Sequence, residues 1–342
     1  MTFTTAPFAA PYEAGNRLFR GTRWRGSDDS YTVDLGDGRT LWLFGDTFVA
    51  DEGKDTRVGS HFVNNTIGLQ TGLDPATATM EFRWEDTADG PKAFFPGEGE
   101  HHYFWPYHGV RLGDRVLVFA MLVGPPSGQR HDSGVWDVVP FTVESWRAFW
   151  LDGIDGPLVE WTVSRADRVP SDAPGILGAS VLLDGDTLYV WSYRDGSSYL
   201  ARFDAAAATV GDLSQAEWWE GSGWTADPQR AVPALTPSTT EFTVHRRDGR
   251  YLLVDVHSFG VPETGVQIRW ADRPEGPWSQ RTEVYRIPEA SREGVICYAG
   301  KGHPELAGPG LLVTYASNTG GLDDVIWTDE SLYYPRFVRV DV

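Results

Sequence analysis

Apolar and polar positions alternate along the chain in a pattern of paired extended runs. Five segments each contain an apolar run, a tight turn rich in Gly and Asp, and a second apolar run. The repeat period is roughly 60–75 residues, and a fixed period of this kind predicts a repeat architecture. The five segments are 27–48, 105–121, 176–194, 240–258 and 298–318.

The second run of each pair is apolar on both faces, as Leu41–Phe44 and Leu188–Trp191 show. A strand of this kind lies between two sheets. Candidate outer strands follow the hairpins, for example NNTIGLQTG and MEFRWED after the first, and GVQIRWAD and TEVYRI after the fourth. Four antiparallel strands in each of five units predict an all-β, five-bladed β-propeller. A β-sandwich with chance turn repeats is the alternative.

Helices are expected to be few. Only the segments 137–150 and 208–219 are long enough, and both also fit connections to outer strands. The 15 Trp, 38 Gly and 22 Pro suit short strands joined by tight turns, with Trp spread through every repeat as blade packing. Although 342 residues would accommodate two domains, we therefore predict that 1–342 form a single propeller domain.

Charge and composition exclude several functions. A net charge of −19 would repel nucleic acid and anionic membranes, so neither is an expected partner. The single cysteine, Cys297, excludes a disulfide framework and a cysteine-based zinc cluster. The N-terminus lacks a basic leader followed by an apolar block. A cytoplasmic location is therefore expected, or secretion if a leader has been removed; the oligomeric state stays open.

Ionisable residues gather at one predicted rim. The innermost strand of a blade starts at one rim, and the second strand returns to it. The first hairpin turns about Asp37-Gly38, so Asp28 and Asp46, each about nine residues away, face each other at its open end. Glu241 begins the fourth hairpin at the same rim. The same reasoning places three histidines there: His108, His257 and His303.

Two or three carboxylates beside aromatic rings are typical of enzymes that cleave glycosidic bonds. One carboxylic acid protonates the leaving oxygen, while another carboxylate activates water or attacks the anomeric carbon. We predict these catalytic roles for Asp28, Asp46 and Glu241. Aromatic faces and polar groups would bind the sugar. The candidates for substrate binding are Trp24, Trp42, Trp105, Tyr107, Asp29, Asn64, Asn65, His108, His257 and His303.

Each candidate also has a structural interpretation. Asp46 fits an Asx-turn at a strand end, and Asp28 and Asp29 fit a solvated loop pair. Glu241 fits an ordinary edge carboxylate. The histidines fit satisfied core residues better than metal ligands, because they lack metal-ligand spacing. We predict no catalytic metal and no required cofactor, with a structural calcium ion on the propeller axis as the alternative.

Motifs in the first, fourth and fifth repeats carry a family resemblance. The run WRGSDDSYTVDLGDGRTLWLFGDTFV, followed by HFVNNTIGLQ, resembles the opening blade of the propellers grouped as domain of unknown function 4185, some of which form glycoside hydrolase family 183. The segments DRPEGPWS, YAGKGHPEL, LLVTYASN and YYPRFVRV are similar to that group and to arabinanase-like propellers of family 43.

The resemblance implies an endo-D-arabinanase that cleaves arabinofuranosyl linkages with acidic residues at the channel mouth. The family's first-blade acids fall on Asp28 and Asp46, although the SDDSY sequence leaves the register between Asp28 and Asp29 open. We therefore predict a glycoside hydrolase acting on furanosides of oligo- or polysaccharides, with arabinan degradation preferred. The alternatives are a glycoside phosphorylase, with Arg23 and Arg25 as phosphate ligands, and a non-catalytic carbohydrate-binding propeller.

Overall fold

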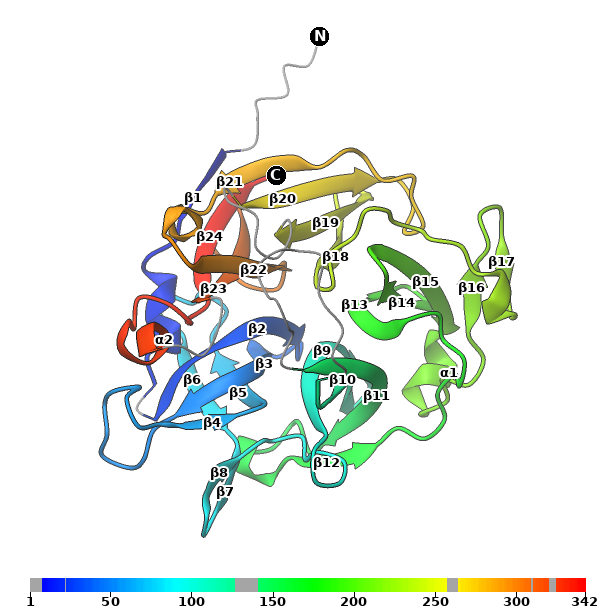
Figure 1. Ribbon diagram of the computed structural model, residues 1–342. Helices are drawn as coiled ribbons and strands as arrows, with labels where there is room; N and C mark the ends of the chain where they lie inside the picture. Colours follow the sequence, from blue (N-terminus) through cyan, green and yellow to red (C-terminus); the bar gives the residue numbers. More distant parts are fainter. Residues whose placement is uncertain (1–7, 22, 127–140, 257–263, 309, 320–323) are drawn as a thin grey trace.

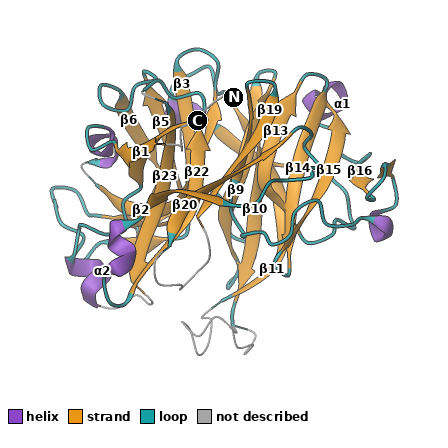
Figure 2. Ribbon diagram, turned by 90° about the horizontal axis from the view of Figure 1, so that it is seen from above, coloured by secondary structure: helices purple, strands orange, loops and turns teal. Residues whose placement is uncertain are grey.

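Five sheets are arranged around a central axis and form a five-bladed β-propeller, as predicted (Figure 1). The computed structural model describes residues 8–21, 23–126, 141–256, 264–308, 310–319 and 324–342. Figure 2 shows the ring from the side, with the strands running between its two faces.

The first three blades follow one another along the chain. Blade 1 consists of β2 (Trp24–Asp34), β3 (Arg39–Val49), β5 (Thr66–Thr71) and β6 (Thr79–Arg83), with β4 (His61–Val63) paired to the end of β3. Blade 2 consists of β9 (Tyr103–Leu112), β10 (Arg115–Gly124), β11 (Thr142–Asp152) and β12 (Thr162–Arg165). Blade 3 consists of β13 (Ile176–Asp184), β14 (Thr187–Arg194), β15 (Ser197–Asp204), β16 (Glu217–Trp219) and β17 (Trp224–Thr225).

The last blade joins the two ends of the chain. Blade 4 consists of β18 (Thr243–Arg247), β19 (Arg250–Val256), β20 (Gly265–Ala271) and β21 (Thr282–Arg286). Blade 5 consists of β22 (Val295–His303), β23 (Leu311–Thr319), β24 (Arg336–Asp341) and β1 (Phe8–Pro11). β1 pairs with β24 from Phe8 opposite Asp341 to Pro11 opposite Val338, so hydrogen bonds between the first and last strands close the ring.

The remaining elements are short. A two-stranded arm, β7 (Glu85–Thr87) and β8 (Gly90–Lys92), follows blade 1. The helical elements are α1 (Ala205–Thr209), α2 (Asp324–Thr328), η1 (Gly15–Phe19), η2 (Leu158–Glu160), η3 (Pro228–Arg230) and η4 (Pro288–Ser291). Of the first candidate helical segment, 137–150, residues 137–140 lie outside the described part and 142–150 belong to β11. The second, 208–219, holds only the end of α1 before β16.

All five predicted hairpins are the inner pairs of the blades, with the last two residues of 240–258 outside the described part. The first hairpin turns where its sequence indicates. Gly36 and Gly38 adopt φ values of 76° and 84°, which other residues rarely adopt, and Leu35 N–H donates to the Arg39 carbonyl.

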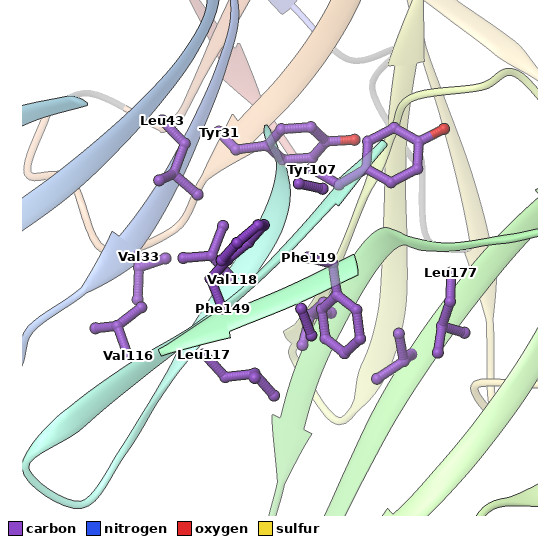
Figure 3. Packing of buried hydrophobic residues seen from close by; sticks show 14 of the residues in the cluster. Tyr31, Val33, Leu43, Tyr107, Val116, Leu117, Val118, Phe119, Phe149 and Leu177 are labelled. Atoms are coloured by element: carbon purple, nitrogen blue, oxygen red, sulfur yellow. The ribbon is translucent and has the colours of Figure 1, made fainter. Parts of the chain in front are cut away.

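Apolar side chains from adjacent blades meet between the sheets. β10 is buried along Val116–Val123, because blade 1 covers one of its faces and blade 3 the other. Figure 3 shows Val33 and Leu43 of blade 1, Phe119 and Phe149 of blade 2, and Leu177 of blade 3 in this one cluster. The burial of both faces explains why the inner runs lack polar alternation.

Candidate active site

The inner strands bring four carboxylates to one end of the axis, which we call the mouth. Ser27 pairs with Thr47 across β2 and β3, so Asp28 and Asp46, the neighbours of these residues, lie together as the hairpin predicted. Asp29 follows in β2, and Glu241 precedes β18. Electrostatic coupling among these carboxyl groups links them into one site.

An irregularity in β2 turns two adjacent aspartates toward the same place. The register shifts on both sides of Asp29, and Asp29 and Ser30 adopt φ values of 63° and 62°. Consecutive side chains of a regular strand point to opposite faces. Here a methyl group on Gly45 would lie 2.5 Å from Asp28 Oδ1 and 2.5 Å from Asp29 Oδ2, so these two oxygens are no more than about 5 Å apart.

Asp28 is held by two tyrosines. Its Oδ2 accepts hydrogen bonds from Tyr298 Oη at 2.6 Å and from Tyr333 Oη at 3.3 Å. Burial among the blades raises the pKa of Asp28 to about 7, with the charge of Glu241 adding to the effect and the two tyrosine hydroxyl groups opposing it. The side chain stays partly exposed, so it is accessible from the mouth.

Asp46 is held by a tryptophan and an asparagine. Its Oδ1 accepts hydrogen bonds from Trp105 Nε1 at 2.8 Å and from Asn64 Nδ2 at 3.3 Å. Burial and, to a smaller extent, the nearby charge of Asp28 raise the pKa of Asp46 to about 8. Asp46 is also partly exposed. A carboxyl group with such a pKa retains its proton near neutral pH and can act as an acid.

Glu241 pairs with a lysine that the sequence analysis did not select. Lys301 Nζ, on β22, lies 2.6 Å from Glu241 Oε2 and 4.2 Å from the centre of the Tyr31 ring, and its side chain is fully buried. Burial and the charges of Glu241 and Asp28 raise the pKa of buried Asp29 well above its ordinary value. A lysine inside the apolar run of the fifth hairpin was the available signal, because lysine is almost never fully buried without a partner.

An aromatic wall stands beside Asp46. The centre of the Trp105 ring is 4.6 Å from the centre of the Phe141 ring and 5.6 Å from that of Tyr103, and both pairs are edge to face. Trp105 is partly exposed. Trp105 therefore lies beside the Asp46 carboxyl group, and its contact with a sugar stays a prediction.

Four predicted substrate ligands are core residues instead: Trp24, Trp42, Asn65 and Tyr107 are each no more than 1% exposed. Trp24 is fully buried, stacks on Phe82 at 4.6 Å and donates through Nε1 to Thr66 Oγ1. Asn65 is also fully buried, and its amide hydrogen bonds with the backbones of Phe95 and Phe104. These four assignments are wrong, because none of the four side chains is exposed at the mouth. The adjacent Asn64 is the one that contacts Asp46.

The histidines form a neutral layer along the axis rather than a substrate site. His108 Nδ1 accepts from Val181 N–H, so Nε2 donates to the Thr32 carbonyl, and burial lowers its pKa to about 4. His303 is fully buried between the hydroxyl groups of Thr32 and Thr314, each at 2.7 Å. Substrate binding by His108 and His303 is therefore contradicted. His257 lies outside the described residues.

The two arginines considered as phosphate ligands have partners of their own. Arg23 pairs with Asp86 at 3.0 Å, and Arg25 donates to the Lys54 carbonyl. Phosphate binding by these arginines, and with it a phosphorylase, stays an alternative. Within the described ranges, no cluster of three or more His, Cys, Asp or Glu residues is arranged to hold a metal ion, so cofactor independence stays a prediction. No helix in the described part is long and apolar enough to cross a membrane.

Family comparison covers nearly the whole chain. Residues 15–342 match the model of a family described as Domain of unknown function (DUF5005). This is not the group named from the sequence motifs, so membership of glycoside hydrolase family 183 stays a prediction. None of the curated proteins matches the chain.

Solved structures share the fold. A presumed hydrolase from Bacteroides ovatus is 17% identical, with a TM-score of 0.68 over 98% of this chain and 90% of that chain. An α-L-arabinofuranosidase from Podospora anserina, solved with cellotriose, is 14% identical, with a TM-score of 0.51 over 94% and 92%. The GH62 α-L-arabinofuranosidase catalytic domain from Coprinopsis cinerea is 13% identical, with a TM-score of 0.50 over 98% and 96%. At these identities the likeness shows the fold alone.

Proposed function

The chain belongs to the DUF5005 family, whose function is unknown, and we propose that it is a glycoside hydrolase acting on furanosides. One observation carries the proposal: Asp28 and Asp46 lie together at the mouth with pKa values raised to about 7 and about 8. Paired carboxyl groups that retain a proton near neutral pH supply the acid and the base that glycosidic cleavage requires.

Asp46 is the general acid in this proposal. Its proton passes to the glycosidic oxygen as the bond from that oxygen to the anomeric carbon breaks, and positive charge develops on the sugar ring. Asp28, whose carboxylate accepts two tyrosine hydroxyl groups, then takes a proton from the attacking water or attacks the anomeric carbon itself. Trp105 orients Asp46 and offers its exposed ring surface to the sugar.

An arabinofuranosyl linkage is the proposed target. The α-L-arabinofuranosidases from Podospora anserina and Coprinopsis cinerea have the same five-bladed fold. The first-blade motif with Asp28 and Asp46 resembles that of endo-D-arabinanases. Lys301 is fully buried, pairs with Glu241 and lies against the Tyr31 ring, so its positive charge is not free to bind an anionic ligand. The mouth therefore favours a neutral saccharide over an anionic one.

The test is incubation of the full chain with aryl furanosides, D-arabinan, L-arabinan and fructan, with reducing-end release measured with and without phosphate. We expect phosphate-independent hydrolysis of an arabinofuranoside. Proton NMR of the first-formed sugar then shows whether Asp28 activates water, with inversion, or attacks directly, with retention. Saccharide binding without cleavage of any substrate would refute the hydrolase and support a carbohydrate-binding propeller.

A further inference from the structure

We propose that Lys301 is a positioning residue that keeps Glu241 ionised and aimed at the mouth, where its negative charge stabilises the positive charge that develops on the sugar ring. This inference rests on the proposed function. It gives the carboxylates different roles, because Asp28 and Asp46 exchange protons, whereas Glu241 remains a fixed anion.

The shape of β22 is the first support. Residues three apart in a regular strand point to opposite faces. A register shift between Tyr298 and Lys301, with Ala299 at a φ of 56°, adds a residue and turns both side chains toward the mouth. Tyr298 then donates to Asp28, while Lys301 pairs with Glu241 at 2.6 Å. The same bulge therefore supplies a hydrogen-bond donor to Asp28 and an ion-pair partner to Glu241.

The surroundings of Lys301 are the second support. Strand β2 contributes Asp29 and the Tyr31 ring, whose face lies 4.2 Å from Nζ; Glu241 approaches from the start of β18. Two histidines, His108 on β9 and His303 on β22, also lie within electrostatic reach and are uncharged, because burial lowers their pKa values. The two histidines therefore add no positive charge beside Lys301.

The energetics of burial are the third support. A fully buried ammonium group is retained only when a carboxylate neutralises it, and removal of one partner leaves an uncompensated charge. Glu241 is the partner in direct contact, at 2.6 Å, and keeps part of its side chain exposed toward the mouth. Asp29 is buried and has a raised pKa, so it holds its proton and leaves the ion pair to Glu241.

The experiment combines Lys301→Met, Glu241→Gln and the double variant, with kcat and KM measured across pH on a cleaved aryl furanoside. Each single variant should lose ~10²-fold in kcat with KM within about threefold, and the double variant should lose no more than either single one.

A purely structural lysine predicts different results. Its loss of kcat would add to that of Glu241→Gln, and that result overturns the proposal. Lys92→Met is the matched control, because Lys92 is exposed on β8. It should remain within about twofold of wild-type kcat, and a loss as large as that of Lys301→Met overturns the proposal.

Thermal unfolding tests the ion pair without substrate. Lys301→Met should lower Tm, and addition of Glu241→Gln should recover part of the loss by removing the unpaired charge. No recovery refutes the pair. If the wild-type protein cleaves no furanoside, the proposed function fails, and the catalytic role of Lys301 fails with it, even if the Tm cycle confirms the pair.

Discussion

The mouth and the histidine layer beneath it both hold titratable groups of inner strands whose pKa values are shifted, yet their electrostatics differ. In the layer, His108 and His303 have both ring nitrogens hydrogen bonded, and burial lowers their pKa values, so they are neutral. At the mouth, Asp28 and Asp46 are like-charged neighbours whose pKa values are raised into the neutral range.

The difference distinguishes residues that stabilise the fold from residues that can take part in a reaction. Buried polar groups whose hydrogen bonds are all made within the protein stabilise one packing arrangement. Their donors and acceptors are occupied, so they do not exchange protons with a ligand. Carboxyl groups crowded together destabilise their own ionised forms, and such clusters are typical of functional sites. Burial alone therefore does not identify an active site. The informative feature is a group whose pKa lies near neutral pH, so that its protonated and ionised forms are both populated.

The largest expected effect is on turnover after the loss of a mouth carboxylate. Asp46→Asn or Asp28→Asn removes the proton donor or the base while the shape is retained, so kcat/KM should fall by ~10²–10⁴-fold. Steady-state kinetics on a cleaved furanoside measure this. Asp37→Asn is the matched control, because Asp37 lies in the opposite turn, pairs with Arg39 and is exposed. Rates within a few-fold of wild type for both mouth variants would contradict the assignment.

Gly45→Ala should damage the site without removing a charge. The added methyl group would lie 2.5 Å from oxygens of both Asp28 and Asp29, so the carboxylates must move. A displacement near 1 Å reduces turnover by about 10–10²-fold. Gly38→Ala, with a φ of 84° and open space around it, should instead lower Tm and leave kcat unchanged. Unchanged kcat in Gly45→Ala would show that the carboxylate spacing is not critical.

pH should act on the two regions in opposite directions. The folded-state pKa of Asp46, about 8, lies above its unfolded value near 3.8, so its contribution to stability is present below pH 3.8 and is lost as pH rises through 8. His108 titrates near 4 when folded and near 6.5 when unfolded, so its contribution is lost as pH falls. Asp46→Asn should therefore raise Tm at pH 9 more than at pH 5; equal shifts would argue against a raised pKa.

His108→Leu should affect stability but not chemistry. It leaves the buried Val181 N–H and Thr32 carbonyl without their partner, which costs about 1–3 kcal/mol of unfolding free energy. Urea unfolding measures the cost, and kcat should stay within about threefold. A loss of turnover comparable to that of Asp46→Asn would place the histidine layer in the mechanism.

Chelation should have the smallest effect. The proposed mechanism uses carboxyl groups and water, so exhaustive treatment with EDTA should leave kcat within about twofold. Loss of activity that one added metal ion restores would overturn cofactor independence. A fall in Tm with unchanged kcat would instead indicate a structural ion.

The local sequence determined the hairpins and one pair of catalytic candidates. Turn residues such as Asp37-Gly38 set the hairpin register, and alternation then places Asp28 opposite Asp46 without information from other blades. Apolar runs such as Leu41–Phe44 likewise report burial between sheets. The five blades and the Asp28–Asp46 pair were predictable for this reason.

Tertiary structure decided the rest of the site. The bulges that turn Asp29 and Lys301 toward the mouth depend on neighbouring strands, and sequence alternation does not reveal them. Trp24 and His303 are residue types that often bind ligands, but both are enclosed by residues that folding brings close. Trp24 stacks on Phe82, and His303 lies between Thr32 and Thr314. Burial and pKa depend on what surrounds a group in three dimensions, and those surroundings come from segments as much as 305 positions apart, as with Asp28 and Tyr333.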